Sequence, residues 1–250
     1  MVRKFASVRE ASEAAVSIII AVARKAAADR GFFSLVLAGG TTPGLTYRLL
    51  AEPANARQIP WQQCYFFWGD ERWLPLSHPD SNFALVHEAL LDKVKVPGRN
   101  IFPIPTGEGT PGEAAALYEK RLRFFFQNRL PAATRRGNAR GDFPTFDLAL
   151  LGMGPDGHTA SLFPGSPLLK EQNKWVVDVP EATGSPPVAR ITLTLPVFNR
   201  AANVLFLVAG PDKLKILETI RARPQEAEER YPAARIRPAG NLVWLAAEKG

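Results

Sequence analysis

Hydrophobic and polar positions alternate along the chain between short apolar runs and longer segments with helical periodicity. The apolar runs are almost continuous and lack the alternation of a half-exposed strand. They therefore predict strands that are covered on both faces, as in a parallel sheet. Such strands are predicted at residues 32–38, 64–68, 100–104, 146–151, 175–179, 191–195, 204–208 and 242–245.

Helical segments lie between these strands. Two capping boxes, Ser7 to Glu10 and Thr110 to Glu113, predict the starts of two helices. The first helix is expected over residues 8–30, with a glycine ending it, and the second runs to about residue 128. Further helices are predicted over residues 81–91 and 212–221 and directly after Pro43, and the Pro, Gly and Arg residues of 131–145 indicate an exposed loop.

Strands separated by helices predict an α/β fold with a doubly wound, mostly parallel, Rossmann-like sheet flanked by helices. The chain has 250 residues, of which 46% are hydrophobic and 22% charged, an ordinary composition for a globular protein. We find no internal repeat and expect a single domain over residues 1–250. Sheets of this kind bind ligands at the carboxyl ends of their strands, near a switch in strand order.

Cysteine usage and hydropathy indicate the compartment. Cys64 is the only cysteine, so no intramolecular disulfide can form, and no Cys/His spacing resembles a zinc site. The apolar residues 14–23 are too short to span a bilayer and are not followed by a small-residue cleavage site. We therefore expect a cytoplasmic protein without a metal, a signal peptide or a membrane span.

The net charge of +7 is concentrated in one segment. Residues 119–140 hold seven Lys and Arg side chains against one acid and so carry +6 of the total. A solvated helix end and loop is the interpretation we favour, because no nucleic-acid motif accompanies the segment. Nucleic-acid binding through phosphate contacts is the alternative. A mildly positive field also suits a small anionic substrate.

The first motif with chemical content follows the strand at 32–38. Gly39, Gly40, Thr41 and Thr42 precede Pro43, which is suited to open a helix. Glycines allow close approach of a ligand, hydroxyls donate hydrogen bonds, and the free N–H groups of a helix start favour an anion. The segment therefore predicts a phosphate cradle. The alternative is a simple strand-to-helix turn with Thr42 as its cap.

The second motif, Trp-Gly-Asp-Glu-Arg at residues 68–72, places charged residues directly after an apolar strand. Asp70 and Arg72 are thereby positioned for a cleft at the strand end. A solvated surface turn with a local ion pair is the alternative. The nearby Ser81 and Asn82 indicate helix capping.

The third motif covers residues 151–164, where three glycines and a proline fix a sharp loop after a buried strand. The loop presents Asp156, Gly157 and His158. Histidine titrates near neutrality and suits a general base that then acts as a general acid. A satisfied turn histidine is the alternative, and His78 and His87 lack such a setting.

The fourth motif consists of two cations. Arg190 begins a predicted strand, and Lys213 lies in the first turn of a predicted helix. A cation is unfavourable beside the positive end of a helix dipole unless an anion is also present. Both residues are therefore candidates for a phosphate site, with exposed surface charges as the alternative.

In this order, the four motifs resemble the glucosamine-6-phosphate isomerase/6-phosphogluconolactonase family, and the resemblance runs from about residue 5 to residue 245. The segment Gly-x-Gly-x-Asp-Gly-His-Thr-Ala-Ser-Leu-Phe-Pro is the most specific part. Thr41 stands where serine is common. The Asp that usually follows the tryptophan of the last strand is missing after Trp244, and we expect this to affect packing or a C-terminal helix rather than chemistry.

The resemblance implies hydrolysis of 6-phospho-D-glucono-1,5-lactone with no cofactor and no catalytic metal. His158 would pass a proton from water to the ring oxygen of the lactone, and Asp156 would orient His158. Arg72, Arg190, Lys213 and the glycine loop would hold the phosphate, and Asp70 would orient a sugar hydroxyl or Arg72. Arg72 would also belong to the catalytic residues, and Gly157 to the substrate-binding ones. The chain has no nucleophile elbow and Cys64 lies in an apolar run, so a covalent acyl-enzyme is not expected.

Two rivals remain at the sequence level. Glucosamine-6-phosphate deaminases share the Asp-Gly-His step but continue into an Asn-Glu-Pro segment, whereas here residues 159–164 read Thr-Ala-Ser-Leu-Phe-Pro. A non-catalytic sugar-phosphate sensor would keep the phosphate loop but has no need of a proton carrier. We expect a small-molecule lactone as the partner, neither nucleic acid nor membrane, and a monomer.

Overall fold

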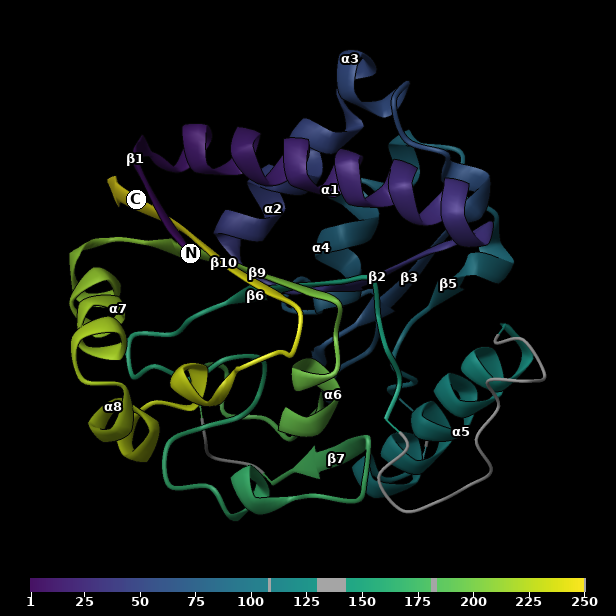
Figure 1. The fold of residues 1–250 in the computed structure, drawn as a ribbon. Coiled ribbons are helices and arrows are strands. Elements are labelled where there is room, and N and C mark those ends of the chain that lie inside the picture. The colour runs from purple at the N-terminus through teal and green to yellow at the C-terminus, as the bar shows by residue number, and fades with distance from the viewer. Residues whose placement is uncertain (108, 130–142, 181–183, 250) are drawn as a thin grey trace.

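A seven-stranded parallel sheet forms the centre of the computed structural model, which describes residues 1–107, 109–129, 143–180 and 184–249 (Figure 1). The strand order is β1-β10-β9-β6-β2-β3-β5, which confirms the predicted mostly parallel sheet. The strands are β1 (Val2–Ser7), β2 (Phe33–Leu37), β3 (Cys64–Trp68), β5 (Ile101–Phe102), β6 (Leu148–Gly152), β9 (Asn203–Ala209) and β10 (Asn241–Lys249).

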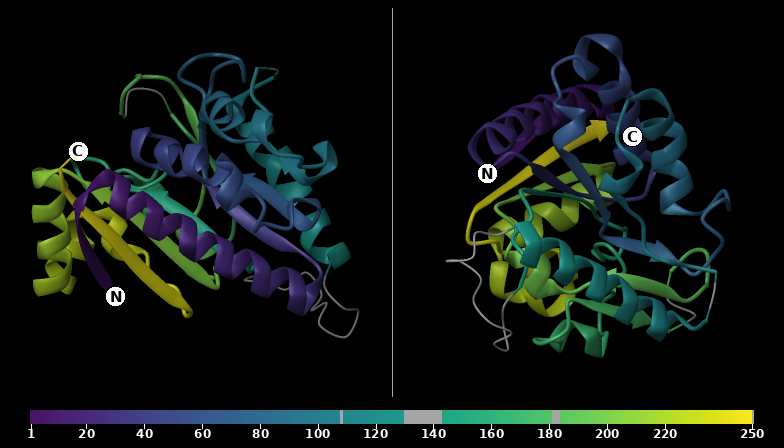
Figure 2. Two further views of the ribbon diagram at one scale, coloured as in Figure 1. Left: turned by 90° about the horizontal axis from the view of Figure 1, so that it is seen from above. Right: turned by 90° about the vertical axis from the view of Figure 1, so that its right-hand side faces the viewer.

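Helices cover both faces of this sheet (Figures 1 and 2). One face carries α1 (Val8–Arg30), α2 (Thr41–Ala51), α3 (Pro53–Ala56) and α4 (Asn82–Ala89). The other carries α5 (Pro111–Arg129), α6 (Leu195–Asn199), α7 (Pro211–Ala222) and α8 (Pro224–Arg230). The ends of α1 are as predicted, because the Ser7 hydroxyl accepts from the Glu10 N–H and Gly31 is left-handed, with φ 77°.

A second, antiparallel sheet of three strands lies beside the first. It consists of β4 (Asp70–Arg72), β8 (Arg190–Leu193) and β7 (Val176–Val179). The apolar runs at 175–179 and 191–195 correctly predicted burial, but burial does not reveal the strand partner. In this sheet Arg72 pairs with Arg190, so the second and fourth motifs become neighbours.

Other elements were not predicted. β1 is an edge strand with mostly exposed or half-buried residues, so it lacks an apolar run. The short helices α3, α6 and α8 begin at or beside a proline and have too few turns to establish a period. No C-terminal helix follows Trp244 in the described chain, which continues along β10 to residue 249. The predicted loop at 131–145 lies largely outside the described residues.

An aromatic cluster joins α5 to the central sheet. Phe125 and Phe126 on this helix contact Phe67 of β3, with ring centroids 5.1 and 6.3 Å apart. Phe126 also contacts Phe146, just before β6, at 4.9 Å. Such pairs stabilise a core beyond the area they bury. No helix in the described ranges is long and apolar enough to cross a membrane.

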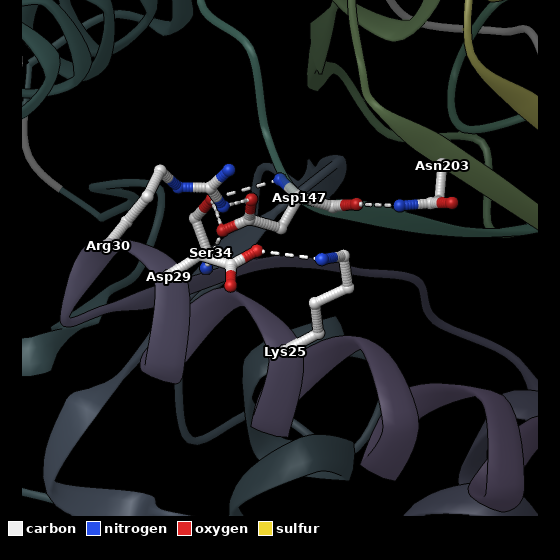
Figure 3. A network of polar contacts seen from close by, with 6 residues as sticks. All are labelled: Lys25, Asp29, Arg30, Ser34, Asp147 and Asn203. Atoms are coloured by element: carbon white, nitrogen blue, oxygen red, sulfur yellow. Dashed lines mark hydrogen bonds and ion pairs between the residues drawn. The ribbon is translucent and has the colours of Figure 1, made fainter.

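A polar network fixes the amino ends of β2 and β6 (Figure 3). Asp147 is buried and accepts hydrogen bonds from the Ser34 N–H, at 2.8 Å, and from its hydroxyl, at 2.9 Å. Arg30 forms an ion pair with the same carboxylate. The Asn203 amide donates to the Asp147 carbonyl at 2.7 Å, so the network also reaches β9.

We expect Asp147→Ala to lower the free energy of unfolding by about 3 kcal/mol, because it leaves buried donors of Ser34 without an acceptor. Any activity at the carboxyl ends of the strands should survive, since the network lies at their amino ends. Urea unfolding measures the loss. Lys25→Ala, which removes only the exposed pair with Asp29, is the matched control and should change stability by less than about 0.5 kcal/mol. Equal effects of the two variants would contradict this account.

Candidate active site

The predicted site residues meet at one cavity of about 270 Å³ at the carboxyl ends of β2, β3, β6 and β9. The cavity lies at the switch in strand order, because chain connections from β2 and β6 lead to opposite sides of the sheet. Nine predicted residues line it: Gly39, Gly40, Thr41, Thr42, Asp70, Arg72, His158, Arg190 and Lys213. Asp156 and Gly157 lie behind His158 and are not part of the lining.

Two helices begin at this cavity with glycine at the N-cap. Gly40 precedes α2 with φ 97°, and Gly210 precedes α7 with φ 96°. Neither helix receives a side-chain cap, so the alternative in which Thr42 caps the first helix is wrong. The first-turn N–H groups of both helices therefore lack side-chain acceptors, an arrangement that favours an anion.

Three cations surround the same cavity. Arg190 is buried, and Arg72 and Lys213 are half-buried. Burial lowers the pKa of Lys213 and Arg190, and for Arg190 the Asp70 carboxylate opposes this while the Arg72 charge reinforces it. Within the described chain no carboxylate forms an ion pair with any of the three, so a bound anion would offset their desolvation.

His158 is held by contacts on three sides. Its Nδ1 lies 2.5 Å from the Asp156 carboxylate, and its ring contacts Phe163 at a centroid separation of 4.8 Å. An ionised carboxylate can only accept, so Nδ1 carries the proton and Nε2 is the basic atom. The contact between Asp156 and His158 that the sequence motif suggested is thus present, and it fixes the orientation of the ring.

Gly154 provides the third contact. A Cβ built on this residue would lie 2.1 Å from Cε1 of the His158 ring, so any side chain there must displace the imidazole. Its backbone N–H also donates to the His158 carbonyl at 2.9 Å. The glycine spacing of the motif therefore serves the packing of the histidine.

If His158 carries protons as the resemblance implies, Gly154→Ala should lower turnover by about 10²-fold, because an ångström of misplacement of a catalytic group has that effect. Steady-state kinetics with the phosphorylated lactone that the resemblance implies tests this. Gly98→Ala is a matched control, since a Cβ on Gly98 meets no atom within 4 Å. Wild-type turnover in Gly154→Ala would show that the close contact with His158 has no functional consequence.

Gly157 shapes the loop from outside the cavity. Its φ is 80°, and a Cβ would lie 2.5 Å from the Tyr231 ring. The Gly157 carbonyl accepts from the Ala233 N–H at 3.0 Å. The segment after α8 therefore supports the histidine loop, a contact between residues far apart in sequence that the motif itself does not reveal.

Asp70 and Glu71 are both buried, so the alternative of a solvated surface turn is wrong. Asp70 accepts from the Ser161 hydroxyl at 2.6 Å and from the Asn82 amide at 3.2 Å. It forms no described hydrogen bond with Arg72, whose Nη1 instead donates to the Asp80 carbonyl at 2.6 Å. Asp70 is thus fixed by neutral donors rather than by the arginine that the sequence suggested.

Glu71 points away from the cavity lining and holds the start of α4. Its carboxylate accepts from the N–H groups of Arg72, Asn82 and Phe83, each at 2.8 Å, and from the Ser81 hydroxyl at 3.0 Å. Burial raises the pKa of Glu71, and these N–H donors oppose the shift. Sequence reasoning missed this role, because Glu71 and the serine that caps α4 are ten positions apart in the sequence.

Two buried tyrosines bond the backbone at the carboxyl ends of β2 and β3. The Tyr47 hydroxyl pairs with both the N–H and the carbonyl of Ala38, and the Tyr118 hydroxyl pairs in the same way with Trp68. Burial raises the pKa of both phenols. Burial also raises the pKa of Cys64 to about 12, which leaves this thiol unsuited to nucleophilic catalysis.

Comparisons with known proteins place the chain in a family. The profile for glucosamine-6-phosphate isomerases/6-phosphogluconolactonase matches residues 6–244. The chain belongs to this family. It is 43% identical to a 6-phosphogluconolactonase of Synechocystis over 221 residues, covering 88% of this chain and 84% of the relative.

Solved structures agree with the family assignment. The crystal structure of 6-phosphogluconolactonase from Thermotoga maritima superposes with a TM-score of 0.80 at 31% identity, covering 99% of both chains. A monomeric glucosamine-6-phosphate deaminase shares the fold, with a TM-score of 0.75 at 19% identity, covering 98% of this chain and 96% of the deaminase. The fold is thus common to both branches of the family, and the lactonase branch is the more similar in sequence.

Proposed function

We propose that this protein is a 6-phosphogluconolactonase, which hydrolyses 6-phospho-D-glucono-1,5-lactone to 6-phospho-D-gluconate without a cofactor. The observation that carries the proposal is an oriented His158–Asp156 pair at a cavity that also contains three cations and two helix N-termini. The Synechocystis relative and the Thermotoga maritima structure, both named 6-phosphogluconolactonase, support it.

Different residues of the cavity bind different parts of the substrate. Arg190 and Lys213, with the N–H groups after Gly39 and Gly40 and the hydroxyls of Thr41 and Thr42, bind the phosphate. Arg72 adds positive charge on the side of β4, and Asp70 accepts hydrogen bonds from the hydroxyls of the sugar. These assignments rest on residues that line a single cavity.

The reaction needs one proton carrier. His158 Nε2 takes a proton from water as the water oxygen attacks the lactone carbonyl, and the resulting imidazolium is stabilised by Asp156. When the tetrahedral intermediate collapses, the bond between the carbonyl carbon and the ring oxygen breaks, and His158 returns the proton to that oxygen. Backbone N–H groups of the glycine loops stabilise the oxyanion.

The deaminase alternative is weakened by the composition of the cavity. Asp70 is the only acid among the described residues that line it, and the segment after His158 supplies no glutamate. The sensor alternative leaves the oriented His158–Asp156 pair without a purpose. We further propose that residues 1–250 act as one α/β domain, because the four motifs, from Gly39 to Lys213, share this cavity.

Parallel assays separate the three functions. Purified protein is mixed with freshly generated 6-phosphogluconolactone and, separately, with glucosamine 6-phosphate. The proposal predicts lactone hydrolysis above the spontaneous background and no release of ammonia. Ammonia release without lactone hydrolysis would assign the protein to the deaminase branch, and inactivity in both assays with retained binding of 6-phosphogluconate would favour the sensor.

A further inference from the structure

Asn82 is a buried amide at the wall of the cavity, and helix capping does not account for its side chain. Ser81 is the N-cap residue of α4, and its hydroxyl accepts from the N–H groups of Phe83 and Ala84. Asn82 is 2% exposed and is among the lining residues. Its Nδ2 donates to the Asp70 carbonyl at 2.8 Å and to the Asp70 carboxylate at 3.2 Å.

The other end of the same amide meets the phosphate loop. Because Nδ2 faces two acceptor oxygens of Asp70, the orientation of the amide is fixed and Oδ1 points away from them. Oδ1 is buried and has no hydrogen-bond partner among the described residues. A Cβ built on Gly39 would lie 1.8 Å from Oδ1 and 2.5 Å from Cγ, so the loop backbone approaches the amide as closely as a glycine allows.

We propose that Asn82 is a positioning residue that fixes the spacing between the Asp70 carboxylate and the phosphate-binding loop at residues 39–42. This inference rests on the proposed function, since the two ends of the substrate contact these two groups. The phosphate is bound at the loop and a sugar hydroxyl at Asp70, so the spacing decides whether the lactone carbonyl lies at His158.

The Asp70 carboxylate is held by donors from other parts of the chain. Ser161 and Asn82 both donate to its carboxylate, from the histidine loop and from α4 respectively. The N–H of Asn82 is itself bonded to Glu71 at 2.8 Å, so the amide is anchored from its own backbone. Two separate chain segments thus fix one carboxylate, an arrangement suited to holding a substrate-binding group in one orientation.

The first test removes the amide. Asn82→Ala is expected to lower kcat/KM for 6-phosphogluconolactone by about 10²-fold, because the phosphate loop and Asp70 lose their common support. Asn100→Ala is the matched control: Asn100 is 1% exposed and donates to the Gln62 carbonyl at 3.0 Å, remote from the cavity lining. Both variants lose a buried amide, so thermal unfolding should detect both, but only Asn82→Ala should affect kcat/KM.

The second test uses the contact with Gly39, and its readout does not depend on turnover. Gly39→Ala is expected to weaken binding of inorganic phosphate by about 10-fold or more in isothermal titration calorimetry, because the new methyl group pushes the loop off Asn82. The three atoms nearest to that methyl all belong to the Asn82 amide. In the Asn82→Ala background they are absent, so adding Gly39→Ala should cause no further loss of phosphate affinity.

The outcomes separate the inference from the function. If Asn82→Ala keeps the lactonase activity of the wild type, the inference is wrong and the proposed function stands. The same holds if Gly39→Ala weakens phosphate binding as strongly in the double variant as it does alone. A wild-type protein without lactonase activity would refute the proposed function, while the calorimetric cycle between residues 39 and 82 would still test their coupling.

Discussion

His158→Ala should lower kcat for lactone hydrolysis by about 10²–10⁴-fold, the usual contribution of acid–base catalysis. The variant removes the one group at the cavity with a basic nitrogen oriented by a carboxylate, at 2.5 Å from Asp156. Folding should be little affected, because the side chain is partly exposed and its described contacts, with Asp156 and Phe163, lie within its own loop. Steady-state kinetics above the spontaneous background measures the loss.

His87→Ala is the matched control for this variant. His87 also lies beside an acid, with its Nδ1 3.1 Å from Asp92, but it is on α4 and does not line the cavity. Its removal should leave kcat unchanged. Asp156→Asn should fall between the two, since the imidazole remains but loses the carboxylate that orients it. Wild-type turnover in His158→Ala would remove this residue from the mechanism.

Glu71→Ala should cause the largest loss of stability, about 4 kcal/mol or more in the free energy of unfolding. The carboxylate is 1% exposed and accepts four hydrogen bonds, and each buried donor left unpaired costs about 1–3 kcal/mol. Because three of the donors belong to residues 81–83, the start of α4 should also shift, and with it Asn82. Activity should therefore fall together with stability.

Chemical denaturation, followed by circular dichroism, measures the effect of Glu71→Ala. Glu113→Ala is the control, since Glu113 also receives bonds at a helix start, from the N–H and hydroxyl of Thr110, but is exposed to water. Water can replace the lost acceptor there, so the loss should be much smaller. A Glu71→Ala protein as stable as the control would contradict the assignment of Glu71 as the anchor of α4.

The sequence predicted the parts of the fold that depend on local pattern. Continuous apolar runs located β2, β3, β6 and β9, and capping boxes located the starts of α1 and α5. Strand ends then indicated where Gly40, Asp70, His158 and Lys213 would meet, because parallel strands place their carboxyl ends at one edge. The cavity lining confirms this convergence.

Contacts across the chain were not predictable in the same way. The pairing of Arg72 with Arg190 depends on a second sheet that joins residues 190 − 72 = 118 positions apart in sequence. The same is true of Tyr231 behind Gly157 and of Ser161 on Asp70. Asn82 was interpreted as a cap because its neighbour is one, and its contact with Gly39 arises only when α4 lies against the loop before α2. Local propensity carries no information on such contacts.

The rate of loss of freshly generated 6-phosphogluconolactone shows whether this cavity hydrolyses a phosphorylated lactone. We expect an initial rate that increases in proportion to protein concentration, exceeds the spontaneous rate, and returns to nearly that rate with His158→Ala. A rate equal to the spontaneous background at every wild-type concentration would mean that the cavity does not catalyse this hydrolysis.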